Sequence, residues 1–139
     1  MIAQRTRYGI SITVELPYDL AVERTKEALA SEGFGVLSEI DVAATMKKKL
    51  GVDLRPYVIL GACNPSLALQ ALTVEQDIGL LLPCNVIVYA AEAPGRSVVS
   101  AIDPVEALQL TGNAKVGPLA DEVRAKLIRV LEALERGAP

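Results

Sequence analysis

The stretch Tyr57–Pro65, which reads YVILGACNP, indicates a buried strand that runs directly into a helix. Residues 57–63 are almost continuously apolar, which is typical of a strand in the middle of a sheet. Asn64 is a residue type preferred at helix N-caps, and Pro65 suits the first position of a helix. We therefore expect Cys63 to lie at the junction between a central strand and a helix N-terminus.

Alternating apolar and polar residues predict further strands on both sides of this stretch. They are expected at residues 10–16, at 34–40, from near Cys84, and in a hairpin partner at 97–102. In the strand at 34–40, one face is expected to carry Phe34, Val36, Ser38 and Ile40, and the other Leu37, Glu39 and Asp41.

Apolar residues at helical spacing predict helices between these strands and one long helix at the end. The expected helices cover residues 19–33, 42–50 and 65–72, with a short turn at Pro104 and a last helix from Pro118. In the second helix, Val42, Met46 and either Leu50 or Lys49 are expected to point inward. The order β-α-β-α-β-α-β-β-α is typical of a single α+β domain spanning residues 1–139. Its antiparallel sheet of about five strands is expected to be covered on one face by helices.

Composition and charge argue against nucleic acid and membranes as partners. With 14 basic and 17 acidic residues the formal net charge is −3, whereas nucleic-acid-binding proteins usually carry a basic excess or stripe. The longest apolar window, residues 78–91, contains Pro83 and Asn85 and is shorter than the roughly 20 residues that a membrane helix needs. Because the N-terminus has no signal-peptide pattern, we expect a soluble, cytoplasmic protein with reduced thiols.

The sequence contains no histidine. Ser-His-Asp and Cys-His catalysis, HExxH metalloprotease sites and His-ligated zinc all require an imidazole, so these mechanisms are excluded. Soft-metal ligands are restricted to Cys63, Cys84, Met1 and Met46. Two cysteines are too few for a four-thiolate zinc site within one chain. We expect no cofactor.

Two blocks of the sequence resemble a known family. They are GFGVLSEIDVAATMKKKLGVDLRPYVILGACNPSLALQAL at residues 33–72 and IGLLLPCNVIVYAAE at residues 78–92. From about Ile12 to Leu134 the chain resembles the family catalogued as domain of unknown function 302, which comprises small bacterial and archaeal proteins. The resemblance implies a TATA-box-binding-protein-like α+β fold, and it implies no activity. The positions that match the family pattern are Glu39, Cys63, Asn64, Pro65, Pro83 and Cys84.

Each of the two cysteines is followed by asparagine, in the pairs Cys63-Asn64 and Cys84-Asn85. The resemblance and the hairpin favour antiparallel pairing of the two strands, which would bring both thiols to one end of the sheet. A parallel crossover would place them at opposite ends. Cys63 is the better nucleophile candidate because helix N-terminal amides favour a thiolate. The simpler interpretation, which we favour, is that both cysteines are small buried core residues.

Two carboxylates form a weaker candidate site. Glu39 and Asp41 share a predicted strand face and could bind a hard cation or act as acid and base. Asp41 is also a suitable helix N-cap, and Glu39 could simply face solvent.

Three functions remain open. The first, favoured over an enzyme, is a non-enzymatic homodimeric module that binds a small-molecule ligand between the sheet and its helices, near the Cys-Asn pairs. The apolar run Leu80–Leu82 would form its dimer interface. The second is a thiol-based redox or soft-metal-binding protein that uses Cys63 and Cys84, with a dimer supplying four sulfurs. The third is an enzyme that uses carboxylate chemistry at Glu39 together with Tyr57 or a lysine.

Overall fold

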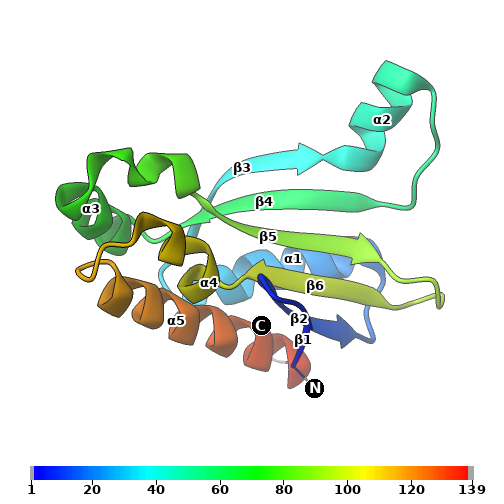
Figure 1. The fold of residues 1–139 in the computed structure, drawn as a ribbon. Coiled ribbons are helices and arrows are strands. Elements are labelled where there is room, and N and C mark those ends of the chain that lie inside the picture. Colours follow the sequence, from blue (N-terminus) through cyan, green and yellow to red (C-terminus); the bar gives the residue numbers. More distant parts are fainter. Residues whose placement is uncertain (1, 138–139) are drawn as a thin grey trace.

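The computed structural model describes residues 2–137, which form a six-stranded antiparallel sheet with helices packed on it (Figure 1). The strands are β1 (Ala3–Thr6), β2 (Gly9–Val14), β3 (Gly35–Asp41), β4 (Tyr57–Cys63), β5 (Cys84–Ala90) and β6 (Ser97–Ile102). The α-helices are α1 (Tyr18–Ser31), α2 (Val42–Leu50), α3 (Pro65–Val74), α4 (Pro104–Leu108) and α5 (Gly117–Glu135). Two 3-10 helices, η1 (Gln76–Leu81) and η2 (Gln109–Thr111), complete the described part.

The predicted α+β class and the antiparallel sheet are confirmed. Across the sheet the strands follow the order β1-β2-β6-β5-β4-β3, so β4 has neighbours on both sides, as its apolar sequence indicated. The sheet has one strand more than the five or so expected, because β1 pairs with β2 at the edge. Every residue of β1 is exposed, so this strand lacks the apolar alternation by which the others were predicted.

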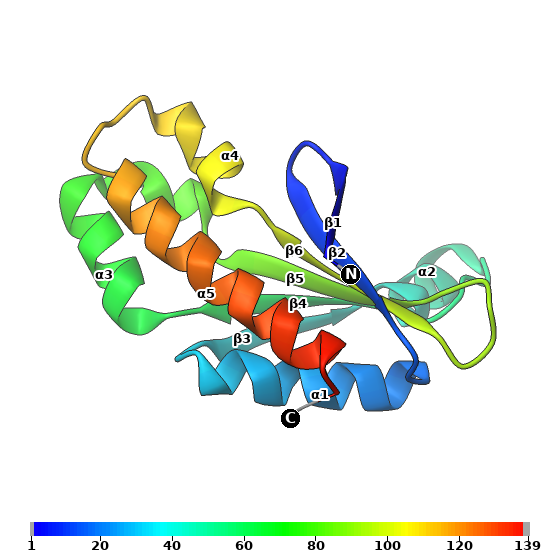
Figure 2. The ribbon, with the colours of Figure 1, turned by 90° about the horizontal axis from the view of Figure 1, so that it is seen from below.

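Helices α1 and α5 lie on one face of the sheet, and the main core fills the space between them (Figures 1 and 2). The side chains buried there come from both layers and include Ile12, Leu60, Val88 and Val99 from the sheet and Leu29, Leu127 and Leu131 from the helices. A smaller core surrounds Ile78, where η1, α4 and the start of α5 meet. No helix within residues 2–137 is long and apolar enough to cross a membrane.

A bulge in β3 changes the face on which its later residues lie. The pairing with β4 shifts between Val36 and Ser38, so that Leu37 is an extra residue in the strand. One inserted residue exchanges the two faces of everything that follows it. The expectation that Ser38 and Ile40 share a face with Val36 is therefore wrong. They lie on the face turned away from α1 and α5.

Helix α2 has the predicted bounds, but it does not pack inward. The Asp41 carboxylate accepts a hydrogen bond from the amide of Ala44 at 2.8 Å, and Gly51 ends the helix with a left-handed φ of 68°. None of its residues is buried, so the predicted inward positions Val42 and Met46 are only half-buried. The helix projects past the end of the sheet, on the side opposite α1 and α5 (Figures 1 and 2).

Candidate functional site

The junction between β4 and α3 is held by Asn64. Its Oδ1 accepts a hydrogen bond from the amide of Leu67 at 3.3 Å, which confirms the predicted N-cap. Its Nδ2 donates to the carbonyl of Glu32 at 3.5 Å, in the turn between α1 and β3. Both polar atoms of the side chain are thus engaged within the protein. The role of Asn64 is therefore to hold the start of α3 beside Cys63, and its side chain has no free polar atom for a ligand.

The two cysteines come to the same end of the sheet, as antiparallel pairing predicted. Cys84 lies opposite Ala62, the residue before Cys63. Both are half-buried free thiols. Burial raises the pKa of the Cys84 thiol to about 11, and the nearby Cys63 contributes to this shift. Cys84 is therefore a neutral thiol at physiological pH.

Both cysteines line an apolar cavity of about 300 Å³ at the end of the sheet next to α3. Its walls come from β4, β5, α3 and the loop before β5, from the start of β3, and from η1, α4 and the N-terminal half of α5. The lining residues are Phe34, Leu37, Ala62, Cys63, Asn64, Leu67, Ala68, Ala71, Leu72, Gly79, Leu82, Pro83, Cys84, Leu108, Leu119 and Val123. None of these residues carries a charge.

Close packing around Gly61 sets the position of the loop that leads to Cys84. A Cβ atom at Gly61 would collide with Ser38 Oγ and lie 3.0 Å from Pro83 Cγ. The peptide bond between Leu82 and Pro83 is cis. Only glycine at position 61 lets β3 and the Pro83 ring approach β4 this closely.

The other predicted site residues lie elsewhere. Asn85 is exposed and opposite Gly61, and it is not part of the cavity wall. Glu39 forms an ion pair with Lys26 of α1, with 2.7 Å between Oε2 and Nζ. The structure brings Cys63, Asn64 and Cys84 together, and it separates Asn85 and Glu39 from them.

Of the two partners considered for Glu39, the structure places a lysine, Lys26, beside it and keeps Tyr57 apart from it. After the bulge, Glu39 lies opposite Leu60, whose side chain faces the helices. Tyr57 instead stacks on Tyr89, with ring centroids 5.4 Å apart, on the other face of the sheet. Glu39 is therefore on the same face as Val36, against expectation, and away from Tyr57. Within residues 2–137, no group of three or more potential His, Cys, Asp or Glu ligands is placed to hold a metal ion.

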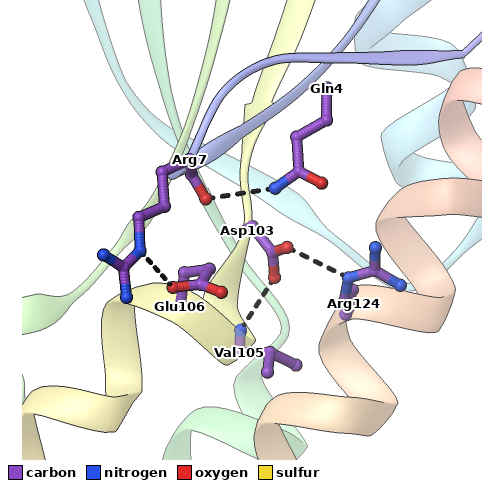
Figure 3. A network of polar contacts seen from close by, with 6 residues as sticks. All are labelled: Gln4, Arg7, Asp103, Val105, Glu106 and Arg124. Carbon is purple, nitrogen blue, oxygen red and sulfur yellow. Dashed lines mark hydrogen bonds and ion pairs between the residues drawn. The ribbon is translucent and has the colours of Figure 1, made fainter.

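A polar network around the buried Asp103 joins α4 to α5 and to the β1–β2 turn (Figure 3). Asp103 accepts hydrogen bonds from the amide of Val105 at 3.0 Å and from Arg124 Nε at 3.1 Å. Arg7 Nε lies 3.4 Å from a carboxylate oxygen of Glu106. Because Asp103 is already paired through both of its oxygens, this network stabilises the fold and presents no vacant carboxylate.

Sequence reasoning missed the residues that close the cavity from the far side. Leu108, Leu119 and Val123 have no feature that distinguishes them from other apolar helix residues. They reach the cavity only because α4 and α5 pack beside α3.

Comparison with known proteins gives a family and a fold. The family model described as "Domain of unknown function DUF302" matches residues 10–134. Among solved structures, "Crystal structure of uncharacterized conserved protein DUF302 from Bacillus stearothermophilus" is similar, with a TM-score of 0.82 and 27% sequence identity. The match covers 94% of this chain and 98% of that chain. No curated protein matches the chain.

Proposed function

Because this chain belongs to the DUF302 family, whose description assigns no activity, we propose a function from the site itself: non-enzymatic binding of a small apolar ligand. The observation that carries the proposal is the cavity that Cys63 and Cys84 line, with its uncharged wall. Binding pockets for small molecules are mostly apolar, with a few polar groups that fix orientation. Here the two thiols are those groups, because the Asn64 amide is engaged within the protein.

The size of the cavity limits the ligand. A volume of about 300 Å³ is at the lower end of the range for small-molecule pockets. With about 30 Å³ for each water-sized group, it holds roughly ten non-hydrogen atoms. A charged head group would find no counter-charge in the wall and would have to remain outside. The expected ligand is therefore a short acyl chain, alcohol or ring compound.

A non-catalytic role follows from the groups available. A nucleophile requires an adjacent base or a lowered pKa, and the cavity wall contains neither histidine nor a carboxylate. Cys84 has a raised pKa, which disfavours the nucleophilic thiolate. The site can therefore hold a molecule by shape and apolar contact more readily than it can transform one.

The test uses 1-octanol, which is about the size of the cavity, as the probe. Ala68 lines the cavity, so Ala68→Leu should fill part of it and weaken octanol binding at least tenfold in calorimetric titration. The matched control is Ala125→Leu, at an exposed position of α5 outside the cavity wall. Equal binding by both variants, or no binding by the unmodified protein, would contradict the proposal.

A thiol-based function is the second candidate, because Cys63 and Cys84 lie close enough for one to influence the other's pKa. Two thiolates could hold a soft cation such as copper(I), whose charge would offset their mutual repulsion. Native mass spectrometry of protein purified without chelator tests this. A stoichiometric metal ion that is lost in Cys84→Ser would favour this function over apolar binding, and metal-free protein would count against it.

A further inference from the structure

The segment from α2 to the start of β4, residues 42–56, is named the α2 arm here, and it exposes several large apolar side chains. Leu50, Val52 and Leu54 are 70%, 46% and 49% exposed, and no residue of α2 is buried. Helices shorter than about 12 residues are marginal in water unless an apolar face is packed against another surface. This nine-residue helix buries none of its residues within the chain, so an apolar surface from outside the chain would stabilise it.

The sheet presents such a surface on the same side of the molecule. The face turned away from α1 and α5, named the open face, carries Ile40, Ile59 and Ile87 in register across three strands, with Tyr57 and Tyr89 beside them. Ile40 is 49% exposed. Antiparallel sheets that face water on one side normally alternate apolar and polar residues. Here β2, β4, β5 and β6 contain no charged residue on either face.

The total surface of the chain is larger than that of an average compact monomer. The chain exposes 7813 Å² at a mass of 14.8 kDa. A compact monomer of this mass exposes about 7,000 Å². The excess of roughly 800 Å² is similar in size to the share that each partner buries in a protein interface of standard size, so covering this surface with one partner would leave an ordinary exposed area.

We propose that a second copy of this chain covers this surface, in a two-fold dimer in which the α2 arm of each copy packs on the open face of the other. A two-fold interface must be self-complementary, since the same patch is used by both copies. Helix α2 projects past the end of the sheet (Figure 1), and the isoleucines of the open face lie on the same side of the chain. This inference is independent of the ligand cavity, which lies at the other end of the sheet beside α3.

The arrangement differs from the interface expected at Leu80–Leu82. Only Leu80 of that run is largely exposed, at 88%. Leu81 and Leu82 pack against the smaller core, and Leu82 also lines the cavity. The run is therefore not a continuous apolar strip, and it lies far from the α2 arm.

Molecular mass in solution tests the proposal, by light scattering and sedimentation from low to high micromolar concentration. The unmodified protein should have a mass of about twice 14.8 kDa. The double variant Leu50→Glu, Leu54→Glu should be monomeric, because two charges would enter an apolar interface. The control Leu80→Glu places a charge on a leucine that is also exposed but lies outside the proposed interface, and it should remain dimeric. A monomeric unmodified protein, or dissociation by Leu80→Glu with a dimeric double variant, would overturn the proposal.

Hydrogen exchange on the unmodified protein gives a second readout that does not depend on how the variants fold. Residues 46–50 are not buried within a single chain, so burial does not slow the exchange of their amide hydrogens. In the proposed dimer their exchange should slow severalfold as the protein concentration rises across the dissociation range. Exchange in α2 that is fast and independent of concentration would contradict the arm-to-face packing.

Discussion

The buried carboxylate of Asp103 accepts a hydrogen bond from Arg124 Nε at 3.1 Å, which ties the start of α4 to the middle of α5. Removal of the arginine would leave a buried carboxylate without its counter-charge. Because Arg124 is about one third exposed, the cost is smaller than for a fully buried pair.

Arg124→Met should therefore lower the free energy of unfolding by roughly 1 to 3 kcal/mol in urea denaturation. Arg129→Met is the control on the same helix, because the Arg129 side chain is 51% exposed beside Glu32. Exposed ion pairs contribute about 0 to 1 kcal/mol, so the control should change little. Equal losses in the two variants would show that the Asp103 pair is no more important than a surface pair.

Gly61→Ala should destabilise the protein, whereas Gly35→Ala should not. The added Cβ at position 61 meets Ser38 Oγ and the Pro83 ring, but at position 35 it meets no atom within 4 Å. Overpacking of this kind costs about 1 to 3 kcal/mol. Thermal and urea unfolding of both variants provide the measurement. If Gly61→Ala is as stable as the unmodified protein, the close approach of β3 and Pro83 to β4 is not as tight as described.

Alkylation of Cys84 should be slow at neutral pH and should accelerate with rising pH until about pH 11, where its pKa lies. The Cys63→Ser variant isolates this thiol; it removes the smaller contribution of Cys63 and keeps burial, the larger cause, so the pKa stays raised. Iodoacetamide is a suitable reagent. In the unfolded chain the same thiol should titrate near the ordinary value of 9.0. A rate that already levels off below pH 9 in folded protein would indicate an ordinary, solvated cysteine.

The same shift predicts how stability depends on pH. Folded protein holds the Cys84 proton more tightly than the unfolded chain does, because burial raises the folded pKa above 9.0. The thiol's contribution is therefore fully present below pH 9 and is lost as pH rises to about 11. Relative to Cys84→Ala, the unmodified protein should lose roughly 2 to 3 kcal/mol of unfolding free energy across this window. If the unfolding free energies of the two proteins change with pH in parallel, the Cys84 thiol does not contribute to the pH dependence of stability. Tyr18 and Tyr57 also have raised pKa values, but both proteins contain them, so their effect cancels.

The features that the sequence determined by itself depend on residues close together in the chain. Apolar residues at 57–63 predicted an interior strand, and Asn64 followed by Pro65 predicted the start of α3, because a cap bonds an amide only three residues away. The bounds of α2 were predicted correctly for the same reason, since Asp41 and Gly51 act on its own ends. Once β4 and β5 were expected to be antiparallel, Cys63 and Cys84 had to meet at one end of the sheet.

Only the tertiary structure decided which side chains share a surface. The bulge at Leu37 arises from pairing with β4, and it moved Glu39 and Ile40 to faces that alternation along the strand could not predict. Part of the cavity wall comes from α4 and α5, which are distant in sequence from both cysteines. The cavity therefore could not be predicted from local sequence patterns. Helix α2 has an amphipathic pattern that predicts burial, yet it projects past the sheet. Such a pattern specifies that an apolar face must be covered, and it does not specify which surface covers it.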